Sequence, residues 1–151
     1  MPRMTEDEAR RRFAGARVAR LATVDSAGRP HLVPVVFARR DDGAIVLAVD
    51  RKPKSSPRLK RLHNIAVNPA VCLLADAYDE DWDRLWWVRA DGVARTVPPA
   101  APAEGDRQVY ARAIGLLVQK YSQYRDAPPD GPVIEVAVHR WIGWRAGQGR
   151  C

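Results

Sequence analysis

The sequence predicts an α+β protein built on a six-stranded antiparallel β-barrel. Apolar and β-branched residues recur in six runs of strand length, and turn-forming residues separate most of these runs. Helical spacing is confined to three places: the N-terminus, the segment after the third strand and the segment before the last strand. At 151 residues the chain is expected to form one domain, residues 1–151, with a sizeable core.

The first half of the chain alternates one helix with three strands. The helix begins after Thr5, because an acidic first turn follows this capping residue. The expected strands are 18–24, 31–38 and 44–49. The turns between them are 25–28 and 41–43. Pro34 lies inside the second strand and has no backbone N–H. It therefore marks an edge, a bulge or the approach of something other than a strand.

The second half contains three strands and two helices. A helix from Pro57 ends at Asn68, before Pro69, and a long helix spans 104–121. The expected strands are 71–77, 85–97 and 133–144. Gly92 inside the second of these predicts a β-bulge, and the acidic segment 79–83 predicts an exposed loop. These elements complete the six-stranded barrel with helices at the N-terminus, after strand three and before the last strand.

A cationic segment follows the third strand. Residues 51–61 contain six Lys or Arg residues and no carboxylate. Ser55 and Ser56 followed by Pro57 are typical of a helix start. A helix N-terminus surrounded by cations favours an anion, because backbone N–H groups, the helix dipole and the side chains all attract it. We therefore expect this turn to hold the phosphate of a cofactor.

Composition narrows the class of protein. The shares of 46% hydrophobic and 28% charged residues are ordinary for a soluble globular protein. The net charge of +7 has two alternative explanations, an arginine-rich genome composition or a demand for anionic partners. The chain has no apolar run of membrane-spanning length and no hydrophobic leader, and its two cysteines form no disulfide framework. A cytoplasmic protein without a membrane segment is expected. The His and Cys residues lack metal-ligand spacing, and no nucleophile or nucleotide motif is present, so no metal site and no catalytic side chain are predicted.

The segment 19–31 resembles the opening of the pyridoxamine-phosphate-oxidase-like split β-barrel proteins. The resemblance continues through the hairpin, the basic turn, residues 68–71 and residues 86–92, and so covers nearly the whole chain. Two pairs of segments resemble sequences of the actinobacterial branch that uses the deazaflavin coenzyme F-420. The first pair is Lys52-Pro53-Lys54 with residues 61–65, and the second is residues 78–82 with residues 85–89.

The resemblance implies a homodimer with two cofactor sites at the subunit interface. In this family, Lys and Arg after the third strand hold the cofactor phosphate, and the ring lies against the second and third strands. The cofactor-binding candidates are therefore Lys52, Lys54, Arg58, Arg61, Asn64, Val33, Pro34, Val35 and Trp87. Trp87 is included because Trp86 and Trp87 on one strand must point to opposite faces. The stretch between Asp50 and Asn64 is longer than in better-known members, which leaves the choice among the cations open.

Three functions compete at this stage. The first is an oxidoreductase that transfers a hydride from reduced coenzyme F-420 to a small organic acceptor of the quinone, tetrapyrrole or activated-alkene type. The second is an FMN-binding oxidase or flavin reductase on the same fold. The third is a nucleic-acid-binding protein that uses the basic turn and exposed tryptophans. The acidic segment 79–83 argues against the third, because it interrupts a continuous basic groove.

Overall fold

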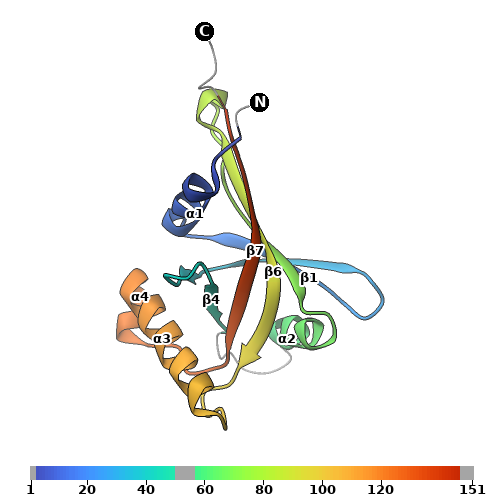
Figure 1. Ribbon diagram of the computed structural model, residues 1–151, viewed down its shortest axis with the longest axis vertical. Coiled ribbons are helices and arrows are strands. Elements are labelled where there is room, and N and C mark those ends of the chain that lie inside the picture. Colours follow the sequence, from blue (N-terminus) through green and yellow to red (C-terminus); the bar gives the residue numbers. More distant parts are fainter. Residues whose placement is uncertain (1–2, 50–56, 147–151) are drawn as a thin grey trace.

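The computed structural model describes residues 3–49 and 57–146 (Figure 1). Its helices are α1 (Glu6–Gly15), α2 (Pro57–Val67), the short 3-10 helix η1 (Trp82–Arg84), α3 (Glu104–Lys120) and α4 (Ser122–Asp126). Its strands are β1 (Ala19–Val24), β2 (Pro30–Val35), β3 (Ala38–Arg39), β4 (Ile45–Ala48), β5 (Ala70–Ala77), β6 (Trp86–Val97) and β7 (Val133–Arg145).

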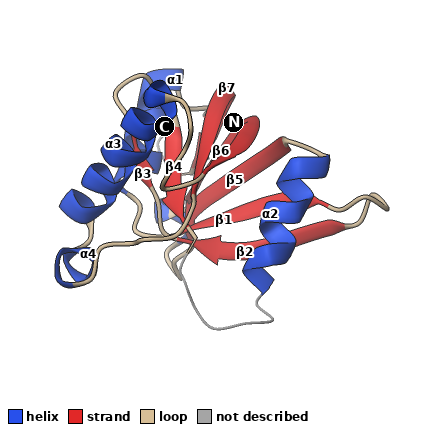
Figure 2. Cartoon of the chain, turned by 90° about the horizontal axis from the view of Figure 1, so that it is seen from below, coloured by secondary structure: helices blue, strands red, loops and turns tan. Residues whose placement is uncertain are grey.

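All seven strands belong to one curled antiparallel sheet in the order β2-β1-β5-β6-β7-β4-β3. In Figure 1, α1, α3 and α4 are seen to the left of β7 and α2 to its right. Figure 2 shows α2 beside β1 and β2. Helices α1 and α2 contribute to the main core, whereas α3 and α4 pack against a second cluster. The two edge strands, β2 and β3, follow each other in the chain, so the sheet curls until its edges approach. This is the α+β split barrel that the sequence predicts, with seven strands in place of six.

The additional strand arises where the sequence predicts one continuous strand over 31–38. The first part, β2, pairs with β1, whereas β3 pairs with β4. Between them Phe37 is in neither ladder: its backbone N–H donates to the Tyr121 hydroxyl (3.1 Å), and its C=O lies 2.9 Å from that hydroxyl. The chain changes pairing partner at this point because a side chain from another element takes over the backbone groups of Phe37.

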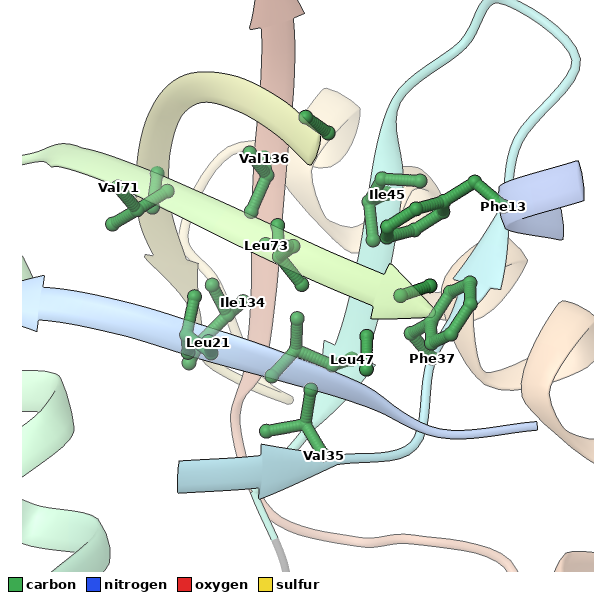
Figure 3. Close-up of a cluster of buried hydrophobic side chains, with 14 of the residues drawn as sticks. Phe13, Leu21, Val35, Phe37, Ile45, Leu47, Val71, Leu73, Ile134 and Val136 are labelled. Carbon is green, nitrogen blue, oxygen red and sulfur yellow. The ribbon is translucent and has the colours of Figure 1, made fainter. Parts of the chain in front are cut away.

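The main core fills the inside of the curled sheet. Leu21, Leu73 and Val136 from three strands point into it (Figure 3). Helix α1 closes one side with Phe13, whose ring lies 4.7 Å from that of Phe37 and 5.4 Å from that of Trp141. A second cluster joins α3 and α4 to the other side of β4; its buried members are Ala38, Val46, Ala113, Leu117, Tyr121 and Val133.

Several local predictions are confirmed. Thr5 caps α1 by accepting the Glu8 N–H (3.1 Å). The register of β6 against β7 shifts between Asp91 and Gly92, as expected for a bulge. The two predicted turns contain glycines with positive φ, Gly28 (81°) and Gly43 (94°). Helix α4 differs from expectation, because the sequence predicts that the long helix ends at Tyr121 with no second helix directly after it. None of the described helices has the length and apolarity needed to cross a membrane.

Candidate functional site

A pocket lies where β2 forms the edge of the sheet, and we call it the edge pocket. Its volume is about 260 Å³. Its walls are Val18, Pro34, Val35, Val36, Ala48, Arg61 and Tyr124. Five of these residues are aliphatic, one is a cation and one is an aromatic residue. This composition suits a ligand that combines an apolar ring with an anionic group.

Helix α2 brings Arg61 to the edge pocket. The helix begins at Pro57, so Arg61 lies one turn inside it. Its far side is held against β1 by buried Asn64, whose Nδ2 donates to Thr23 Oγ1 (3.1 Å). Lys60 Nζ lies 3.5 Å from Asp25 Oδ2 in the β1–β2 turn. These two contacts determine which side of α2 faces the sheet and leave Arg61 at the pocket.

The strand side of the edge pocket comes from β2. Pro34 lies opposite Arg20 of β1 and removes one donor from the strand, while Val35 turns into the core. Because β2 is an edge strand, the backbone groups on its outer edge have no partner strand in the described sheet. A wall with apolar side chains and available backbone groups can contact both the face and the polar edge of a planar ring.

The aromatic wall comes from Tyr124 of α4. Tyr121 separates α3 from α4, with extended backbone angles (φ −117°, ψ 117°) that turn the chain toward the sheet. The ring of Tyr124 meets that of Tyr121 edge-on, with 6.0 Å between centroids. Sequence reasoning missed Tyr124 because α4 has only five residues and no recognisable start or stop signal.

The structure brings together three of the predicted cofactor-binding residues: Pro34, Val35 and Arg61 all line the edge pocket. Val33 and Asn64 do not line this pocket: Val33 packs against the main core, and Asn64, a residue of α2, is buried against β1. Lys52 and Lys54 fall outside the described residues. Arg58 lies on α2, but its side chain is also outside the described part of the chain.

Trp87 lines a different pocket, on the outer face of the sheet. We define this outer face by the side chains of β2, β1, β5 and β6 that point away from the core. The outer pocket has a volume of about 430 Å³. It is lined by Arg20, Ala22, Leu32, Cys72, Leu74, Asp76, Tyr78, Trp87 and Arg89. The outer pocket reaches β2 at Leu32, whereas Pro34 lines the edge pocket, so Trp87 and Pro34 do not share a pocket within one subunit.

The outer face combines apolar surface with paired charges. Leu32 is 65% exposed and lies beside Ala22 on the neighbouring strand. Arg20 lies 3.5 Å from Asp76, and Arg89 lies 2.8 Å from Asp91. Burial raises the pKa of the Cys72 thiol, and the negative charge of Asp91 adds to this effect. The thiol is therefore kept in its protonated, weakly nucleophilic form.

Within the described ranges, no group of three or more His, Cys, Asp or Glu side chains is arranged to hold a metal ion. The cations of the outer face are neutralised by neighbouring carboxylates, which is unfavourable for contacts to a nucleic-acid backbone. The edge pocket brings a cation, an aromatic ring and an apolar strand surface together.

Residues 5–145 match the protein family described as pyridoxamine 5'-phosphate oxidase. Solved structures share the fold. An FAD-binding protein from Mesorhizobium loti has a TM-score of 0.69 at 18% identity, with 94% of this chain and 95% of that chain covered. A heme binding protein from Mycobacterium smegmatis has a TM-score of 0.70 at 25% identity, with 99% of this chain and 57% of that chain covered. The heme storage protein HutZ from Vibrio cholerae has a TM-score of 0.64 at 18% identity, with 90% and 89% covered. No curated protein is significantly similar to this chain.

Proposed function

This chain belongs to the pyridoxamine 5'-phosphate oxidase family, and on that basis we propose that it is an oxidoreductase whose edge pocket binds a phosphorylated planar redox cofactor. The first candidate is the deazaflavin coenzyme F-420. The observation that carries the proposal is the convergence of Arg61, Pro34 and Tyr124, which come from three separate elements, on one pocket.

The pocket fits part of such a cofactor. Arg61 offers a guanidinium to a phosphate, and the aliphatic wall and Tyr124 offer apolar surface to a ring. The volume of about 260 Å³ is below the roughly 300–1,000 Å³ of whole small-molecule sites. The described residues of one subunit therefore account for one portion of a complete site, and further contacts must come from elsewhere.

A reduced deazaflavin supplies a hydride from its own ring, so the protein needs to bind, orient and exclude water rather than provide a nucleophile. Arg61 would hold the phosphate, while Pro34 and Val35 would contact the ring. Lys52, Lys54 and Arg58 remain proposed as additional phosphate ligands, on the strength of their sequence alone. The acceptor is proposed to be a small organic molecule of the quinone, tetrapyrrole or activated-alkene type.

FMN is the second candidate cofactor, in an oxidase or flavin reductase. The family is defined by a pyridoxamine phosphate oxidase, and the structure from Mesorhizobium loti is described as FAD-binding. FMN and F-420 both join a planar tricyclic ring to a phosphate, so the edge pocket alone favours neither. Titrating the protein separately with F-420 and FMN distinguishes them, because the preferred cofactor gives the lower dissociation constant.

The test of the site compares Arg61→Ala with Arg112→Ala. Both changes remove one arginine, but Arg112 lies on α3 and pairs with Asp41 (3.2 Å), away from the pocket. Loss of a charge-assisted hydrogen bond should weaken cofactor binding about 10- to 100-fold in Arg61→Ala. Arg112→Ala should bind as the wild type does. Equal dissociation constants for all three proteins would reject the phosphate assignment. Tight hemin binding without affinity for either cofactor would replace the proposal with heme binding.

We also propose that the protein is a homodimer in which a second copy covers the outer face. Leu32 and Trp87 give this face apolar surface, and no described α-helix contributes to its pocket. The outer face carries both arginines and aspartates, so a two-fold symmetric contact can place each charge beside an opposite charge of the second copy. A partner subunit would also supply contacts that the small edge pocket lacks. Trp87 would then lie at the subunit interface.

The dimer is tested by sedimentation. Leu32→Arg places a charge in the proposed interface and should shift the protein from dimer to monomer. Val67→Arg is the matched control, because Val67 is 50% exposed at the end of α2 and does not line the outer pocket. A wild-type protein that sediments as a monomer, or a Leu32→Arg variant that remains dimeric, would refute this interface.

A further inference from the structure

We propose that Tyr124 is the residue that binds the planar ring of the ligand, so that the edge pocket accepts aromatic heterocycles with a phosphate and discriminates against aliphatic phosphates. This inference rests on the proposed function, since it concerns the same pocket. It goes further because it assigns the ring contact to α4, an element that contains none of the predicted cofactor-binding residues.

The position of Tyr124 follows from the way Tyr121 is anchored. The Tyr121 hydroxyl lies 3.1 Å from Phe37 N, 2.9 Å from Phe37 O and 3.0 Å from Arg17 O. These contacts tie the junction of α3 and α4 to the chain segments that enter β1 and leave β2. The Tyr124 N–H in turn donates to the Tyr121 C=O (3.0 Å). Tyr124 is therefore held in a constant position relative to Val18, Val35 and the rest of the pocket wall.

The chemistry of the wall explains why a ring is expected there. Tyr124 is partly buried against the second apolar cluster, and it supplies the pocket's only aromatic surface among the described residues. The remaining wall is aliphatic apart from Arg61. An aromatic side chain in the same pocket as an apolar strand surface can contact a flat ring, and offset or edge-on contact with that ring adds to simple burial. An aliphatic phosphate would gain the Arg61 contact but nothing from Tyr124.

The decisive experiment compares FMN with riboflavin, which has the same ring without the phosphate. Tyr124→Leu should weaken binding of both by about five- to tenfold, whereas Tyr124→Phe should bind both nearly as the wild type does. The dissociation constant for riboflavin divided by that for FMN should be unchanged in Tyr124→Leu and should fall toward one in Arg61→Ala. Gln123→Ala, at an exposed position of the same helix, is the control for disturbance of α4.

The outcomes separate this inference from the proposed function. Wild-type affinity in Tyr124→Leu overturns the role of Tyr124 and leaves the cofactor site intact. A change in Tyr124→Leu without one in Arg61→Ala supports Tyr124 and overturns the phosphate assignment. If the wild type binds neither ligand nor F-420, both proposals fail. Equal losses in Tyr124→Leu and Tyr124→Phe would also overturn the ring contact.

A measurement on the wild type guards against poor folding of Tyr124→Leu. The chain has four tyrosines, so ring-labelled tyrosine gives a simple NMR spectrum, in which Tyr124→Phe identifies one resonance by its absence. Adding FMN should shift the Tyr124 ring signal more than those of Tyr78 and Tyr110, which do not line the edge pocket. An unshifted Tyr124 signal at saturating FMN would overturn the inference.

Discussion

Replacing Tyr121 with Phe should destabilise the protein by about 2–4 kcal/mol. The hydroxyl accepts the Phe37 N–H and carries one proton that it can donate to the C=O of Phe37 or Arg17. Phe37 is fully buried, so water cannot readily replace these bonds. Leaving a buried donor or acceptor without a partner costs about 1–3 kcal/mol, and the change leaves at least one of each.

Urea unfolding followed by tryptophan fluorescence measures this cost, since the chain has five tryptophans. With an m-value of about 2 kcal/mol/M, the midpoint should fall by about 1–2 M while the slope stays the same. Tyr110→Phe is the matched control: its hydroxyl donates a single hydrogen bond to Gly131 O (2.9 Å) in a partly buried site, so its loss should be about 1 kcal/mol. If Tyr121→Phe costs no more than Tyr110→Phe, the anchoring role of Tyr121 is refuted.

Two other changes test local features of the sheet. Gly92→Ala should lower the free energy of unfolding by about 1–3 kcal/mol, because the new Cβ would lie 2.5 Å from Ala137 O. Gly105→Ala in α3 is the control: its Cβ meets nothing within 4 Å, so the change should be neutral or stabilising. Equal effects of the two changes would contradict the close approach of Gly92 to Ala137. Backbone N–H bonds from Arg29 and Ala27 lower the pKa of Asp25 to about 2 from its usual 3.8. The carboxylate therefore stabilises the fold above about pH 4 and loses this effect as the pH falls toward 2. The difference in free energy of unfolding between wild type and Asp25→Asn should shrink over that range. A constant difference would show that Asp25 does not titrate in this way.

Much of the local structure could be predicted from the sequence, because the relevant signals lie within a few residues of one another. Thr5 and the acidic residues after it indicate the start of α1, and the glycines at 28, 43 and 92 indicate two turns and a bulge. The opposite orientations of Trp86 and Trp87 follow from strand alternation alone: Trp86 packs against the main core and Trp87 lines the outer pocket. Arg61 could also be predicted as a cofactor-binding residue, because residues 51–61 contain six cations and no carboxylate.

The composition of the edge pocket was decided only by the tertiary structure. Pro34, Arg61 and Tyr124 are far apart in the chain, and periodicity carries no information about which segments meet. The division of one expected strand into β2 and β3 depends on a hydroxyl from the end of α3, more than eighty residues away. Likewise, only the folded sheet shows that Trp87 shares the outer pocket with Leu32 and not the edge pocket with Pro34. Sequence therefore determined the elements and their turns, whereas closure of the sheet determined which side chains share a pocket, because packing and register are properties of the whole chain.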